Sequence, residues 1–177
     1  MPYLALLLAL SGVAGSFAPG PRTERILWSP EAFIRATPVG AFHGEALRAA
    51  HALLGAPYHF GGSGPGRCPT GEHPACADCS GLLCVAFAAA GVTLPHSSAG
   101  LAALGQPVAQ ADIQPGDILV FRSDGNANGE VNHSGIYVGN GLFLHAGSRG
   151  VRLDELDGRY WGDARRPRLR AIRRITR

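Results

Sequence analysis

The sequence DCSGLLCVAFAAAG occupies residues 78–91 and contains the segment that decides the fold. Residues 80–90 are almost wholly apolar and are followed by Gly91, which predicts a buried helix with a glycine at its C-terminal end. Cys79 stands directly before that helix, where unpaired backbone N–H groups and the positive end of the helix dipole would face its sulfur. Such a position lowers the pKa of a cysteine. The segment therefore predicts a nucleophilic thiolate, although a buried structural cysteine or half of a disulfide would suit an isolated Cys79 better.

A partner base for Cys79 is predicted in a downstream hairpin, in which His133 enters the first strand and His145 lies late in the second. With a two-residue turn, the two histidines would point to opposite faces of the sheet. With a three-residue loop over residues 139–141, His145 pairs with Gly135 and shares a face with His133. We predict this odd-length loop, or a bulge. In that case His133 is the general base and His145 orients its ring.

The order of the predicted elements indicates an α+β fold. A first helix is predicted over residues 45–54, with Leu47, Ala50 and Leu54 on one face and Gly55 as its stop. Strands are predicted over residues 117–121, 134–138 and 142–146, and an edge strand over 169–175. Helices that precede an antiparallel sheet are typical of the α+β class.

The composition predicts one exported domain. The 177 residues are 46% hydrophobic, which suffices for one good core, and the net charge of +3 is too mild to indicate nucleic acid as the partner. Residues 1–18 have the apolar stretch and small-residue zone of a signal peptide, with an uncleaved membrane anchor as the alternative. We interpret residues 19–40 as a leader or linker arm and residues 41–177 as the functional domain.

Several motifs in this order resemble the NlpC/P60 family of cell-wall cysteine peptidases, over about residues 44–167. The matching motifs are Gly55-Ala56-Pro57-Tyr58 with Gly61-Gly62, Asp78-Cys79-Ser80-Gly81, Leu94-Pro95 before Ser97-Ser98, Gln114-Pro115-Gly116-Asp117, the stretch from His133 to Gly139, and Leu144-His145-Ala146. The resemblance implies a papain-like fold with the nucleophile helix packed on a central antiparallel sheet. It also implies Cys79, His133 and His145 as the catalytic residues.

The family resemblance further implies hydrolysis of the amide bond between γ-D-glutamate and a diamino acid in peptidoglycan stem peptides, through an acyl-thioester. Such chemistry requires no metal or organic cofactor. Tyr58, Asp78 and Ser80 are the expected substrate-binding residues. The alternative is a structural role, as an ordinary packed aromatic for Tyr58 and as helix caps for Asp78 and Ser80. We expect a bacterial monomer that is secreted, periplasmic or wall-associated, with stem peptides as partner and no stable membrane insertion after signal removal.

The segment before the nucleophile leaves other interpretations open. Cys68, His73, Cys76 and Cys79 have the spacing of a zinc site, in which Cys79 would be a ligand. A Cys68–Cys76 disulfide is the favoured prediction, with Cys84 as core. A non-catalytic wall-binding module and a papain-like amidase or acyltransferase are the rival functions. The arginine-rich residues 165–177 suit a solvated edge strand or a contact with anionic wall polymers.

Overall fold

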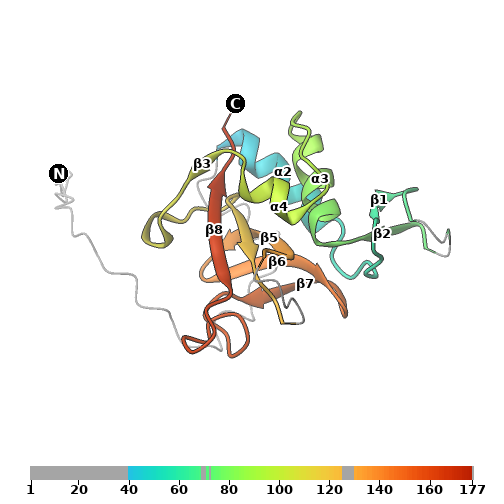
Figure 1. Ribbon diagram of the computed structural model, residues 1–177. Coiled ribbons are helices and arrows are strands. Elements are labelled where there is room, and N and C mark those ends of the chain that lie inside the picture. The colour runs from blue at the N-terminus through green and yellow to red at the C-terminus, as the bar shows by residue number, and fades with distance from the viewer. Residues whose placement is uncertain (1–39, 69–70, 72, 125–129, 177) are drawn as a thin grey trace, which may run out of the picture.

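The computed structural model describes residues 40–68, 71, 73–124 and 130–176, and Figure 1 shows the arrangement of their helices and strands. The predicted signal peptide and nearly all of the predicted leader lie outside the described residues. The helices are α2 (Ala41–His51), α3 (Cys79–Ala89), α4 (Ser98–Ala102) and the 3-10 helix η2 (Gln110–Asp112). The strands are β1 (Ser63–Pro65), β2 (Ala75–Ala77), β3 (Gln106–Pro107), β4 (Ile118–Phe121), β5 (His133–Gly139), β6 (Leu142–Gly147), β7 (Gly150–Glu155) and β8 (Leu169–Arg174). No helix in the described part of the chain is long and apolar enough to cross a membrane.

The main sheet is antiparallel and has the strand order β3-β8-β4-β5-β6-β7. Helix α3 packs on β5 and β6, and α2 packs on α3, so the helices cover one face of this sheet (Figure 1). The predicted α+β class and the nucleophile helix on a central antiparallel sheet are confirmed.

The local sequence explains where α3 begins and ends. The Asp78 carboxylate caps it by accepting the backbone N–H of Gly81 at 2.7 Å, and Gly91 takes a left-handed φ of 80° just after its end. Leu82, Leu83 and Phe87 are fully buried against the sheet and α2. Each such side chain contributes roughly 1.5–3 kcal/mol through burial, so packing fixes the helix and the position of its first residue.

The sheet is buried on both faces around its centre. Ile118 and Val120 face the helices, whereas Leu119 and Phe121 face a second core that also contains Trp161. Strand β4 is therefore a continuous apolar run, as expected for a strand without a solvated face. The second core brings the segment around Trp161 against the β5–β6 hairpin.

The register of the β5–β6 hairpin is as predicted. Ile136 lies opposite Leu144 and Tyr137 opposite Phe143, and a bulge separates these pairs from the pair at the turn. The register therefore places His133 and His145 on the same face of the hairpin.

Two predicted elements require correction. Helix α2 begins at Ala41 and ends at His51, and Leu54 is 42% exposed in the turn that follows, so it does not belong to the buried face. The strand predicted at the edge is β8, which lies between β4 and β3 because Gln106 and Pro107 pair with its last two residues. Strand β7 forms the opposite edge and was not predicted.

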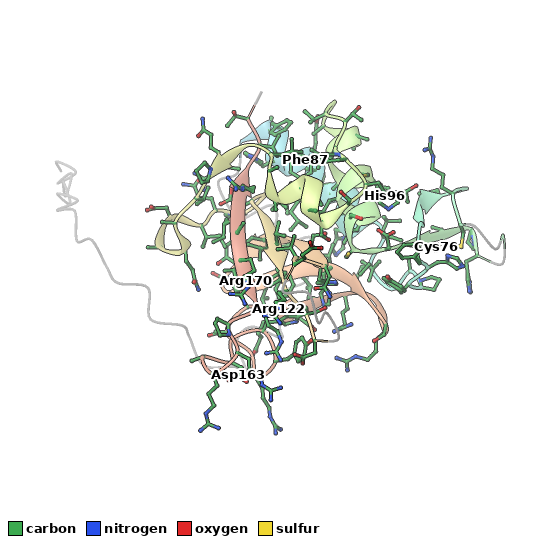
Figure 2. All side chains as sticks on the ribbon, in the orientation of Figure 1. Cys76, Phe87, His96, Arg122, Asp163 and Arg170 are labelled. Atoms are coloured by element: carbon green, nitrogen blue, oxygen red, sulfur yellow. A yellow bond between two sulfur atoms is a disulfide. The ribbon has the colours of Figure 1, made fainter. Side chains whose placement is uncertain are left out.

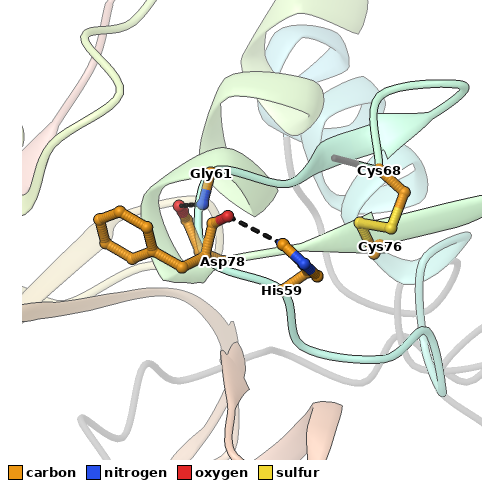
Figure 3. Close-up of a disulfide and its surroundings, with 6 residues drawn as sticks. His59, Gly61, Cys68, Cys76 and Asp78 are labelled. Carbon is orange, nitrogen blue, oxygen red and sulfur yellow. Dashed lines mark hydrogen bonds between the residues drawn. A yellow bond between two sulfur atoms is a disulfide. The ribbon is translucent and has the colours of Figure 1, made fainter. Parts of the chain in front are cut away.

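A small separate sheet, β1–β2, precedes the nucleophile helix. Cys68 and Cys76 form a disulfide at this hairpin, close to Gly61, which precedes β1, and Asp78, which follows β2 (Figure 3). The favoured disulfide prediction is confirmed. The zinc-site interpretation is wrong, because the bond uses two of the four sulfur and nitrogen ligands that the site would need.

Candidate active site

Cys79 is the first residue of α3 and is 9% exposed. Its Sγ lies 3.8 Å from the hydroxyl of Ser98, a buried residue at the start of α4. Either atom can donate in this contact. The thiol thus lies at the N-terminal end of a buried helix, which is the position that the sequence predicted, and it contacts the Ser98 hydroxyl.

His133 and His145 are in direct contact. The Nε2 atom of His133 lies 2.8 Å from the Nδ1 atom of His145, and the Nε2 atom of His145 lies 3.0 Å from Oδ2 of Asp154. A carboxylate only accepts, so the Nε2–H of His145 donates to Asp154. When the His145 ring is neutral, its Nδ1 then accepts from Nε2–H of His133. These assignments leave Nδ1 of His133 as the nitrogen with a free lone pair, which is the atom a general base needs.

Asp154 is held in place by three side chains. Arg152 donates to both carboxylate oxygens at 2.9 and 2.8 Å, and the indole N–H of Trp161 donates at 2.8 Å, in addition to the bond from His145. Burial alone would raise the pKa of Asp154, but the hydrogen bonds from His145, Arg152 and Trp161 outweigh it and hold the pKa well below its ordinary value. Asp154 is therefore a fixed negative charge behind His145.

The ring of His133 is neutral over most of the pH range. Burial, and next the charges of His145 and Arg152, lower its pKa to about 3, although Asp154 acts in the opposite direction. The ring stacks on Trp161 with centroids 5.2 Å apart. His133 is consequently in its basic form, with its orientation fixed on two sides.

The packing of α3 on β5 brings the helix of Cys79 and the strand of His133 together. No hydrogen bond joins Cys79 Sγ to His133 among the residues that the structure describes. Cys79 and His133 therefore lie on two elements, α3 and β5, that pack together. The hydrogen bond of the His133 ring goes to His145.

The three expected substrate-binding residues have different environments. Tyr58 is 39% exposed, and its pKa is raised by burial and then by the charges of Cys79 and Asp78, so it lies near Cys79. Ser80 is buried and donates to Asp78 at 3.0 Å.

Asp78 is buried, and its oxygens are already occupied. It accepts the N–H groups of Gly61 and Gly81 at 2.8 and 2.7 Å and binds His96 Nε2 at 2.8 Å (Figure 3 shows the Gly61 contact). Burial would raise the pKa of Asp78, but the hydrogen bonds from Gly81, His96 and Gly61 lower it. Capping is therefore observed for Asp78, and the carboxylate keeps its charge.

Asp154, Trp161, Ser98 and His96 also belong to the site and were not predicted as site residues. The signal for Asp154 lies in the alternation of residues 150–155, which form the third strand of a meander. Once that strand is placed, His145 lies opposite Arg152, and Asp154 follows two residues later on the same face. The other three residues come from loops and a short helix, and only tertiary packing brings them to the site.

The NlpC/P60 family model matches residues 55–170. A probable endopeptidase of Mycobacterium tuberculosis is 44% identical over 119 residues, which cover 67% of this chain and 27% of that protein, so the chain spans about a quarter of this relative's length. A solved NLP/P60 family protein of Staphylococcus aureus is 30% identical with a TM-score of 0.63, over 80% of this chain and 44% of that one. RipD of Mycobacterium tuberculosis, described as a non-catalytic NlpC/p60 domain protein adapted to peptidoglycan binding, shares the fold at 24% identity and a TM-score of 0.60, over 78% of this chain and all of that one.

Proposed function

The chain belongs to the NlpC/P60 family, and from this membership we propose that it is a cysteine endopeptidase that hydrolyses peptidoglycan stem peptides. The observation that carries the proposal is the hydrogen-bond chain from His133 through His145 to Asp154, on strands packed against the helix that begins at Cys79. A peptide-binding module without catalysis has no need of an oriented, neutral imidazole on a strand that packs against the helix of a free cysteine.

The proposed reaction begins with transfer of the Cys79 proton to Nδ1 of His133. The thiolate attacks the amide carbonyl carbon, and the electron pair of the C=O bond moves to oxygen, giving a tetrahedral oxyanion. The backbone N–H of Cys79 and the Tyr58 hydroxyl are the proposed donors to that oxygen. The imidazolium then gives its proton to the amide nitrogen as the C–N bond breaks, so an amine leaves and a thioester remains.

Hydrolysis of the thioester reverses these roles. His133 takes a proton from water, the hydroxide attacks the acyl carbon, and the C–S bond breaks to return the sulfur as thiolate. The product is a carboxylic acid. Asp154 supports both steps, because its charge favours the protonated state of His133 that burial and Arg152 oppose.

We propose the bond between γ-D-glutamate and the diamino acid as the site of cleavage. Asp78 keeps a negative charge near the nucleophile, so it attracts a free amino group at the end of a short stem even though its oxygens already have partners. Tyr58, partly exposed at the same place, contacts the peptide. A substrate in the wall implies a secreted, periplasmic or wall-associated location.

Mass spectrometry of digested muropeptides tests this proposal. The protein should release fragments that end in γ-D-glutamate, and the Cys79→Ala variant should release none. A Cys84→Ala variant is the matched control, since Cys84 is the other free cysteine and lies in the middle of α3. Binding of muropeptides by both proteins without new fragments would support the non-catalytic alternative.

A further inference from the structure

An arginine-rich hollow lies beside the candidate active site, where β4 ends and β8 begins. It has a volume of about 410 Å³, and its lining includes five arginines and one acidic residue: Arg122, Arg165, Arg166, Arg168, Arg170 and Asp124. Arg122 and Arg170 extend from neighbouring strands at this end of the sheet (Figure 2). The hollow is separate from the catalytic hydrogen-bond chain, and the proposed peptidase reaction uses none of these residues.

The lining of the hollow holds more positive than negative side chains. Its one carboxylate, Asp124, is already paired with Arg168 Nη2 at 2.8 Å. Arg165, Arg166 and Arg170 are exposed, and within the described part of the chain their guanidinium groups form no ion pair. Several like charges in one hollow repel each other unless an anion neutralises them.

Arg168 gives the hollow a rigid base. Its side chain is 6% exposed, lies over the Tyr160 ring at 4.0 Å, and donates to the Tyr160 carbonyl. Its buried Nε has no hydrogen-bond partner among the described residues, so one donor remains unused. The base is therefore preorganised, which reduces the entropy lost on binding.

Two residues at the hollow are sequence neighbours of residues that contact or pair with His133. Arg122 follows Phe121, which lies opposite His133 in the sheet. Tyr160, under Arg168, precedes Trp161, which stacks on the ring of His133. A polymer held in the hollow would thus lie beside the reacting groups.

We propose that this hollow binds a polymer of phosphodiester-linked units. Every cationic residue available to the hollow is an arginine, and guanidinium groups match phosphate oxygens with two parallel hydrogen bonds. One isolated carboxylate would neutralise only one of the exposed guanidinium groups of Arg165, Arg166 and Arg170, whereas consecutive phosphodiesters would neutralise several. The hollow would hold the catalytic domain on anionic polymer next to the peptide that it cleaves.

The test uses the full-length chain carrying Cys79→Ala, so that binding is measured without any cleavage and independently of the proposed reaction. Fluorescence anisotropy follows binding of a labelled linear polyphosphate. We expect the Kd to rise at least about tenfold in Arg165→Gln/Arg170→Gln, which removes two exposed guanidinium groups from the hollow. The expected change in Arg48→Gln/Arg67→Gln is less than about twofold, because these exposed arginines lie on α2 and next to β1 and do not line the hollow.

Poly-L-glutamate of matched charge is the second arm of the test. It should bind at least about tenfold more weakly than polyphosphate if the site recognises phosphate geometry. Equal losses in the two double variants would overturn the proposal, because the attraction would then come from overall charge. Equal binding of the two polymers, or no binding of polyphosphate, would overturn it as well.

Discussion

At the scale of single residues, the candidate site depends on which nitrogen of each histidine carries a proton. The sequence predicted that His133 and His145 share a face, because strand alternation and an odd-length loop determine the direction of both side chains. It did not predict Asp154, which accepts a hydrogen bond from His145, because the strand over residues 150–155 that carries it was not recognised. The contact of Ser98 with Cys79 could not be predicted either, since it joins two helices that only the tertiary fold brings together.

Asp154→Asn tests the role of this carboxylate as a positioning residue. Asparagine keeps the shape but loses the charge that favours protonated His133, so kcat should fall about tenfold, which is less than the roughly 10²–10⁴-fold that general acid–base catalysis as a whole contributes. The pH at half-maximal kcat should also shift. The control is Asp112→Asn, at an exposed acidic residue outside the site. An unchanged pH profile in Asp154→Asn, with only a lower melting temperature, would show a purely structural role.

The pKa of His133 predicts a pH dependence of stability. Because the folded pKa is about 3 and the ordinary value is 6.5, the unfolded chain binds a proton between these values that the folded chain does not. Stability should therefore fall as the pH falls from 6.5 towards 3, by up to about 1 kcal/mol per pH unit. Denaturant unfolding of the wild type and His133→Gln at pH 6.5 and 4.5 measures this. Equal losses in both proteins would contradict the prediction.

At the scale of elements, the sequence predicted the helices and strands that have a clear hydrophobic pattern, and it missed the strands that are very short. The apolar run of α3, with its capping residue and its glycine, was placed to within one residue. Strands β1, β2 and β3 have only two or three residues each, too few to show a period. The first helix was placed several residues late, because Leu54 continues the apolar pattern into the turn.

Gly81→Ala tests how closely the first turn of α3 packs against the backbone at Gly62. A Cβ at this position would collide with the carbonyl oxygen of Gly62, so we expect a loss of about 1–3 kcal/mol in unfolding free energy. Gly44→Ala is the control, because its nearest neighbour would be the Arg48 guanidinium at an ordinary 3.6 Å. There the same substitution in helix α2 should raise the stability by about 0.4–1 kcal/mol. Denaturant midpoints of both variants provide the measurement.

The disulfide at the β1–β2 hairpin predicts a thiol count. Under denaturing, non-reducing conditions, two of the four cysteines, Cys79 and Cys84, should react with a thiol reagent. Replacing both Cys68 and Cys76 by serine should cost about 2–3 kcal/mol, as expected for a short closed loop. Four reactive thiols would contradict the disulfide.

At the scale of the whole molecule, the chain encloses two cores on opposite faces of one sheet. The sequence predicted the α+β class, because the order of its periodic segments allows few arrangements. The second core was not predicted, since Trp161 and Leu156 lie in a segment without periodicity. The domain assigned to residues 41–177 stays a prediction. A chain that begins at residue 40 should unfold in one cooperative transition by calorimetry, and two separate transitions would contradict it.

The hydrogen-bond chain behind His133 also determines where a captured proton can go. The chain of hydrogen bonds from His133 through His145 to Asp154 is a route along which a proton can be transferred. The low pKa of Asp154 makes that carboxylate a poor proton acceptor, so proton transfer along this route to Asp154 is unfavourable. In the proposed reaction, the proton that His133 takes from Cys79 therefore does not pass on to Asp154, and the nitrogen of the departing amine is its acceptor.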